Sequence, residues 1–144
     1  MKARCIYNMK EPTVHGMLRI TQGSIEDYTK NDIGDFIVRG YIFKPHQFFA
    51  YFAPIDSDDK MSYSDFFWIL INKVFPEAIG EELDGKTHIR IRDQFRGEFH
   101  FIIDKEKMKI YIRHGWSKEY QSYEEALIGI RDFLTAKVEK KVVC

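Results

Sequence analysis

Residues 86–113 read KTHIRIRDQFRGEFHFIIDKEKMKIYIR, and this stretch decides the fold. Apolar and polar residues alternate over 86–92, 98–104 and 107–113, which is the period of two typical of a half-buried β-strand. The connections are Asp93–Gly97 and the tight corner Asp104–Lys107. Short polar connections of this kind join antiparallel neighbours. The stretch therefore predicts a three-stranded β-meander over residues 86–113.

The alternation assigns each meander residue to one of two faces. The face predicted to enter the core carries Thr87, Ile89, Ile91, Phe99, Phe101, Ile103, Met108, Ile110 and Ile112. The opposite, polar face carries His88, Arg90, Arg92, Glu98, His100, Ile102, Lys109, Tyr111 and Arg113. The loop lengths predict one cross-strand row of Arg92, Glu98 and Arg113, and a second row of Arg90, His100 and Tyr111.

A helix near 122–138 is predicted to follow the meander. The segment Ser122-Tyr-Glu-Glu125 has the spacing of a capping box, in which serine and glutamate each bind the other's backbone amide. The apolar spacing predicts a buried stripe of Leu127, Ile130, Leu134 and Val138. Gly129 lies inside this helix, where glycine is unfavourable, and it therefore indicates close backbone packing.

A second helix is predicted near 62–75. Ser62 or Ser64 can cap it, Asp65 suits its first turn, and Pro76 stands where it should stop. Residues 66–71 read FFWILI, so the helix is apolar on every side. Such a helix must be covered all round, either by its own domain or by another chain. A buried central helix and an exposed partner-binding ridge are the two interpretations.

The first half of the chain is predicted to be rich in strands, which are Met1–Met9, Val14–Ile20, Asp35–Phe43 and Gln47–Ala53. Ser24–Asp27 resembles a capping box and predicts one helical turn. The aromatic residues between Tyr41 and Phe52 are predicted to fill the core from two paired strands. The fold class is thus α+β, mainly antiparallel sheet, in one domain spanning 1–144.

Composition narrows the class of protein. Of the 144 residues, 44% are hydrophobic and 31% are charged with a net charge of zero, which argues against disorder and against a uniformly basic nucleic-acid binder. No apolar run is long enough to span a membrane and no secretory signal is visible, so we expect a cytoplasmic protein. A bridge between Cys5 and Cys144 is possible, but a reduced pair is expected in that compartment.

Neutral overall charge hides an uneven distribution. Between Asp56 and Asp84 there are eight acids and two bases, whereas the meander is basic. The acidic stretch and its aromatic helix predict a docking surface for a protein partner. We expect this partner to have a basic domain that the acidic charge attracts. The predicted partner-binding residues are Asp56, Asp58, Asp59, Asp65, Trp68, Glu77, Glu81, Glu82 and Asp84. Alternatively, the acidic and basic regions neutralise each other within the fold.

The outline GKTHIRIRDQFRGEFHFIIDKEKMKIYIRHGW (85–116) followed by SYEEALIGIRDFL (122–134) resembles the small immunity proteins of bacterial polymorphic and contact-dependent toxin systems. The resemblance is architectural, covers the second half of the chain and includes no diagnostic motif, so it carries over no functional residue. It implies a non-enzymatic inhibitor that binds and neutralises a cognate toxin.

Two alternatives remain open. In the first, the polar face binds or cleaves RNA without a metal, with His100 as base or acid and Glu98 as its partner. Its phosphate clamp is Arg90, Arg92 and Arg113, with Tyr111 beside them. In the second, the protein is a homo-oligomeric accessory protein. Histidine spacing matches no metal motif, and nucleotide-binding and serine-hydrolase motifs are missing, so we expect no metal and no cofactor.

Overall fold

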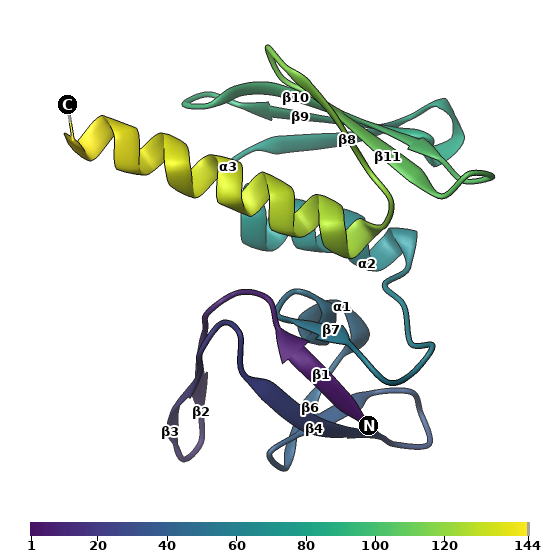
Figure 1. Cartoon of the computed structure of the whole chain (residues 1–144), viewed down its shortest axis with the longest axis vertical. Coiled ribbons are helices and arrows are strands. Elements are labelled where there is room, and N and C mark those ends of the chain that lie inside the picture. Colours follow the sequence, from purple (N-terminus) through teal and green to yellow (C-terminus); the bar gives the residue numbers. More distant parts are fainter. Residues whose placement is uncertain (144) are drawn as a thin grey trace. The chain divides into compact units, whose positions relative to one another are not determined.

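The computed structural model describes the backbone of residues 1–143 and the side chains of residues 1–136 (Figure 1). The described residues form twelve strands in three antiparallel sheets, together with α-helices, so the predicted α+β class is confirmed. By its internal contacts the chain divides into two compact units, Met1–Phe66 and Phe67–Cys144. The assignment of residues 1–144 to one domain stays a prediction. No helix among the described residues is long and apolar enough to cross a membrane.

The N-terminal unit contains a five-stranded sheet and a separate hairpin. The order in the sheet is β6-β5-β4-β1-β7, so the first strand lies between strands that come much later in the chain. The sheet strands are β1 (Lys2–Cys5), β4 (Ile25–Lys30), β5 (Phe36–Val38), β6 (Tyr41–Phe43) and β7 (Phe52–Pro54). The hairpin is β2 (Met9–Thr13) with β3 (Gly16–Ile20).

Two predictions in this unit are wrong. The predicted helical turn at Ser24–Asp27 is strand β4, because these residues pair with β1 and lead into the fully buried Tyr28. The predicted strand Gln47–Ala53 begins in helix α1 (Pro45–Phe49), passes through a turn, and is a strand only at its end, where it enters β7. Pro45 occupies the first helical turn, where its missing N–H is harmless. The Lys44 amide donates to Gln47 Oε1 at 2.9 Å and fixes the helix start.

The predicted aromatic core is confirmed, although a helix supplies part of it. Phe48 is fully buried and stacks on Phe36 with ring centroids 4.1 Å apart, and on Phe52 at 5.2 Å. Tyr28 tilts against Phe48 at 5.1 Å. Aromatic pairs at these separations stabilise beyond the area they bury. Cys5 is buried at the end of strand β1 of this sheet, and its possible bridge lies outside the described residues because Cys144 does.

The predicted helix near 62–75 is confirmed as α2 (Tyr63–Ile69), which continues as a π-helical turn η1 (Leu70–Val74). Ser62 caps it reciprocally, since the Asp65 amide donates to Ser62 Oγ at 3.1 Å and the Ser62 amide to Asp65 Oδ2 at 3.3 Å. Burial is uneven around the helix. Phe66, Ile69 and Leu70 are fully buried, whereas Phe67, Trp68 and Ile71 are half-buried.

The C-terminal unit is built on a sequential five-stranded sheet, β12-β11-β10-β9-β8. Its middle strands are the predicted meander, β9 (His88–Asp93), β10 (Gly97–Asp104) and β11 (Lys109–Arg113). The flanking strands β8 (Ile79–Leu83) and β12 (Ser117–Tyr120) were not predicted. A short 3₁₀ turn, η2 (Asp84–Lys86), connects β8 to β9.

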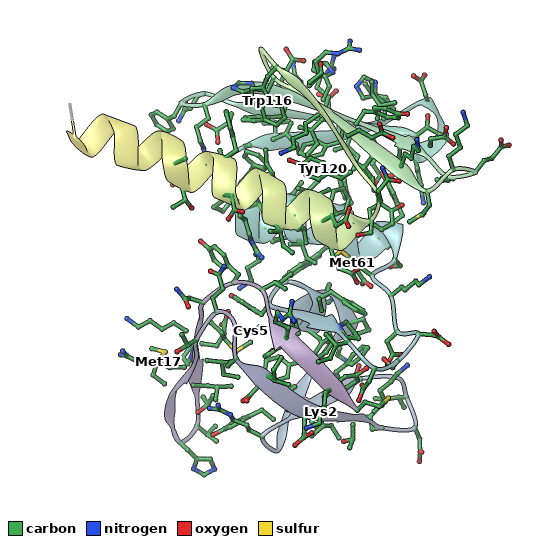
Figure 2. The ribbon with its side chains drawn as sticks, in the orientation of Figure 1. Lys2, Cys5, Met17, Met61, Trp116 and Tyr120 are labelled. Carbon is green, nitrogen blue, oxygen red and sulfur yellow. The ribbon has the colours of Figure 1, made fainter. Side chains whose placement is uncertain are left out.

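Helix α3 (Tyr123–Val143) lies against one face of this sheet (Figure 1). The predicted core residues Leu127, Ile130 and Leu134 are buried, and Val138 lies outside the described side chains. Tyr120 fills the space between sheet and helix (Figure 2), because a Cβ at Gly129 would stand 2.2 Å from the Tyr120 hydroxyl. The close packing predicted at Gly129 is therefore confirmed.

Two predictions about the core face of the sheet and one about the cap of α3 need correction. Ile89, Ile91, Phe99, Phe101, Ile103, Ile110 and Ile112 are buried as predicted. Met108 is not, since it is 41% exposed in the β10–β11 turn, and Thr87 lies outside the strands. The α3 capping box is half right. The Glu125 amide donates to Ser122 Oγ at 3.1 Å, but the Glu125 carboxylate accepts from the Gln121 amide instead of the Ser122 amide.

Candidate functional site

The candidate site is the face of the C-terminal sheet that points away from α3, which we call the outer face. Because side chains alternate along each strand, the register defines its members. They are Ile79, Glu81, Leu83, His88, Arg90, Arg92, Glu98, His100, Ile102, Asp104, Lys109, Tyr111, Arg113, Ser117 and Glu119. All are half-buried or exposed, and no described element of the C-terminal unit covers them. The predicted polar face of the meander is thus the centre of a wider surface.

The rows of this surface agree with prediction on one side of β10 only. Glu98 pairs with Arg92 and His100 with Arg90, as predicted. Across the other hairpin, however, His100 pairs with Arg113, and Tyr111 pairs with Ile102 instead of His100. The predicted register between β10 and β11 is therefore wrong by two residues.

The β10–β11 turn explains this shift. Asp104 Oδ1 accepts the amides of Glu106 and Lys107, both at 3.1 Å, and Met108 adopts a left-handed conformation with φ of 51°. Four residues therefore connect the strands where two were predicted. A shift of two leaves each side chain on its predicted face, because the side-chain period is also two.

Glu98, His100 and His88 lie in a row across two strands of the outer face, and one hydrogen bond joins the two imidazoles. Glu98 Oε1 lies 3.2 Å from His100 Nε2, and His100 Nδ1 lies 2.8 Å from His88 Nε2. The bond between the imidazoles needs one ring nitrogen as donor and the other as acceptor. The carboxylate beside His100 Nε2 favours the tautomer of His100 that carries its proton there, and His88 Nε2–H is then the donor to His100 Nδ1.

Burial lowers the pKa of His88 below its ordinary value, and the charge on a protonated His100 would lower it further. Arg90 and Arg113 act in the same direction, while Asp84 opposes them. The neutral form of His88 is therefore favoured at neutral pH. A neutral imidazole can accept a proton or bind a metal ion, whereas the protonated form can do neither.

Ion pairs occupy most of the charges around this row. Glu81 binds both Arg90, at 2.5 Å, and Arg92, and the hydrogen bond from Arg90 lowers the pKa of Glu81 below its ordinary value. At the other edge, Lys109 and Glu119 pair at 2.8 Å, which raises the pKa of Lys109 and lowers that of Glu119. Most charges on the outer face are consequently paired with an opposite charge, so the face is not a surface of unpaired cations.

The structure divides the predicted acidic docking surface between the two units. Residues up to Asp65 belong to the N-terminal unit, and Trp68 and the later acids belong to the C-terminal unit. Four of the acids have hydrogen bonds or ion pairs within the fold, and these are Asp56, Asp59, Asp65 and Glu81. The other four are exposed, namely Asp58, Glu77, Glu82 and Asp84. Trp68 is half-buried. Their role in binding a partner stays a prediction.

Among the described residues, no group of three or more His, Cys, Asp or Glu side chains is placed to hold a metal ion. Sequence reasoning placed His88 on the right face but missed its contact with His100. The available signal was the correctly predicted pairing of Arg90 with His100, which puts His88 diagonally beside His100.

Comparisons of the chain with protein families, with curated proteins and with solved structures give no match. The site is therefore interpreted from its own geometry and chemistry.

Proposed function

We propose that the protein binds another protein through the outer face of its C-terminal sheet and the exposed acids beside strand β8, and that it acts as an inhibitor in the manner of a small immunity protein. The observation that carries the proposal is an uncovered sheet face whose charges are already paired within the fold. Its partner on this view is a toxin domain with a basic surface.

Apolar side chains between the charges support a protein partner. Ile79 is 62% exposed and Tyr111 is 38% exposed, while Leu83 and Ile102 are half-buried beside them. Protein interfaces combine apolar contact with tyrosine and arginine and are poor in unpaired charge at their centre. The outer face has this composition.

The pairing of the arginines favours a protein over RNA. Affinity for a phosphate backbone comes from cations that release counterions on binding. Glu81 already neutralises Arg90 and Arg92, which the RNA alternative requires as a phosphate clamp. A polyanion would have to displace that carboxylate.

The exposed acids supply the electrostatic attraction. Glu82 lies on the edge strand β8 opposite Ile89, so it is exposed at the sheet edge on the side away from the outer face, while Asp84 directly follows the strand and Glu77 precedes it. Acids at the rim of an apolar patch accelerate the encounter with a basic partner more than they tighten the final complex. We therefore expect these residues to affect association and its salt dependence.

The test is capture from the native host followed by reconstitution with the purified partner. Outer-face variants Ile79→Asp and Tyr111→Ala should weaken the reconstituted complex at least tenfold, and Glu82→Lys with Asp84→Lys should slow its association. Asp32→Lys is the matched control, because it changes an exposed acid of the N-terminal unit that is not among the predicted partner-binding residues. Co-expression should also protect cells from the captured partner.

Three outcomes would contradict the proposal. Binding that is unchanged in all outer-face variants would move the interface elsewhere. Cleavage of a labelled single-stranded RNA by the metal-free protein, abolished by His100→Ala, would support the RNA alternative. Sedimentation as a stable oligomer that buries Tyr111 would support the homo-oligomeric alternative.

A further inference from the structure

We propose that His88 and His100 form a two-imidazole binding site for a divalent transition metal ion of the zinc, copper and nickel type. This inference does not depend on the proposed function. It rests on the juxtaposition of two ring nitrogens from neighbouring strands, with a carboxylate on the far side of one ring.

The distance between the two nitrogens suits a shared ion. His88 Nε2 and His100 Nδ1 face each other at 2.8 Å, with ring centroids 5.0 Å apart. Two nitrogens bound tetrahedrally to Zn²⁺ at its usual bond length stand about 3.3 Å apart. The nitrogens must therefore move apart by about 0.5 Å, and each ring must turn so that its lone pair points at the shared ion instead of at the other ring. Both side chains are half-buried on an open face, so the surrounding structure permits this movement.

Glu98 supplies the supporting contact that metal-bound histidines usually have. A ligating histidine generally donates its other ring N–H to a carboxylate, which fixes the tautomer and strengthens the ligand. Here Glu98 Oε1 lies 3.2 Å from His100 Nε2, so the carboxylate favours a proton on Nε2 and leaves the lone pair of Nδ1 for the ion. Only His88 must change tautomer, moving its proton from Nε2 to Nδ1 through solvent, and no net proton is released.

The surrounding charges allow a cation. Arg90 and Arg113 oppose it, since both act on His88. Glu81 offsets the Arg90 charge, and the carboxylates of Glu98 and Asp84 attract the cation. Imidazole ligands select zinc, copper and nickel over magnesium and calcium, which prefer oxygen. With two protein ligands, the remaining coordination positions would take water.

The test is titration of the tag-free, chelator-treated full-length protein with ZnCl₂. Calorimetry should give 1:1 binding, and imidazole ¹⁵N spectra should show His88 Nε2 and His100 Nδ1 shifting together. His88→Gln and His100→Gln should each abolish this binding. Glu98→Ala should weaken it about tenfold to hundredfold, the usual effect of losing such a supporting carboxylate. MgCl₂ should not bind.

His15→Gln is the matched control, because His15 is exposed in the β2–β3 turn of the N-terminal unit. Zinc affinity that survives both His88→Gln and His100→Gln would overturn the proposal, and so would the lack of 1:1 binding by the wild type. If either variant fails to fold, the wild-type ¹⁵N spectra decide the question. Zinc-induced shifts confined to other histidines would then overturn it.

Discussion

Each unit of this protein has a sheet that carries a row of interacting ionisable side chains, and the two rows differ in burial. In the N-terminal unit the Tyr28 hydroxyl lies 2.5 Å from Ser57 Oγ and 2.7 Å from Asp59 Oδ2, and Lys30 binds Asp59 at 2.9 Å. Tyr28 is 1% exposed. In the C-terminal unit, His88, His100 and Glu98 remain half-buried or exposed on the outer face.

The difference in burial separates a network that stabilises the fold from one whose groups can bind a ligand. A buried polar group must keep its hydrogen bonds, because losing a partner costs the full desolvation penalty. An accessible group exchanges its partner for water or a ligand at little cost. Asp59, predicted to contact a partner, is thus committed to holding the segment after β7 against the N-terminal sheet. His88 and His100 stay free to exchange their shared hydrogen bond for a ligand.

The largest effect that tests this comparison is on stability. Asp59→Ala removes the acceptor of Tyr28 and Lys30, and we expect a loss of about 2–3 kcal/mol in the free energy of unfolding, typical of hydrogen bonds to a charged group. Glu98→Ala is the control and should cost less than about 1 kcal/mol, since its partners are accessible. Urea unfolding measures both. Equal losses would mean that the two networks do not differ as described.

A second prediction concerns alkaline pH. Burial, together with the hydrogen bond to Asp59 and its charge, raises the pKa of Tyr28 to about 12. The folded state therefore resists deprotonation more than the unfolded state, whose tyrosines titrate near 10. The stability that Tyr28 provides is present below pH 10 and is lost as pH rises from about 10 to 12.

Ultraviolet absorption of tyrosinate follows this titration, with Tyr28→Phe identifying the step that belongs to Tyr28. The variant should lose the step near pH 12 and keep those at lower pH. If all tyrosines of the folded wild-type protein ionised near pH 10, Tyr28 would not be protected from solvent as described.

The C-terminal sheet could be predicted from the sequence better than the N-terminal sheet, because its strands are joined by local connections. Consecutive strands are neighbours, and the Asp93–Gly97 loop correctly predicted that Arg90 lies beside His100. In the N-terminal sheet, β1 pairs with β4 and with β7, which lies about fifty residues further along. No local pattern contains such a pairing, so individual segments were predicted but not their partners.

Parts of the site were hidden for similar reasons. Strand β8 reads IGEEL, whose glycine and paired glutamates have low strand propensity, and pairing with β9 overrides it. Consequently, Glu81 was predicted to face a partner when it binds Arg90 and Arg92. The contact between His88 and His100 depends on register, and no spacing motif in the sequence encodes it.

A third prediction tests the corrected register by the sign of a smaller effect. Met108 holds a left-handed φ of 51° and is 41% exposed in the β10–β11 turn. Met108→Gly relieves this conformation and should stabilise the protein by about 0.5–1 kcal/mol. In the register predicted from sequence, Met108 would be a core strand residue, and the same change would destabilise. Thermal unfolding distinguishes the two, with Met17→Gly, an exposed strand position, as the destabilising control.

The smallest effect is a shift in one titration on the outer face. The pKa of His88 lies below its ordinary value through burial and then through the charge of His100. His100→Ala removes that charge and opens the site, so the pKa of His88 should rise toward about 6.5. Below that pH the unfolded chain binds more protons than the folded chain. The free energy of unfolding of the wild type should therefore fall as pH drops below about 6.5, and that of the variant should fall less. Imidazole proton shifts measure the titration, and His15→Ala should leave it unchanged. A His88 that titrates at its ordinary value in the wild type would show that neither its burial nor the charge of His100 acts on it as described.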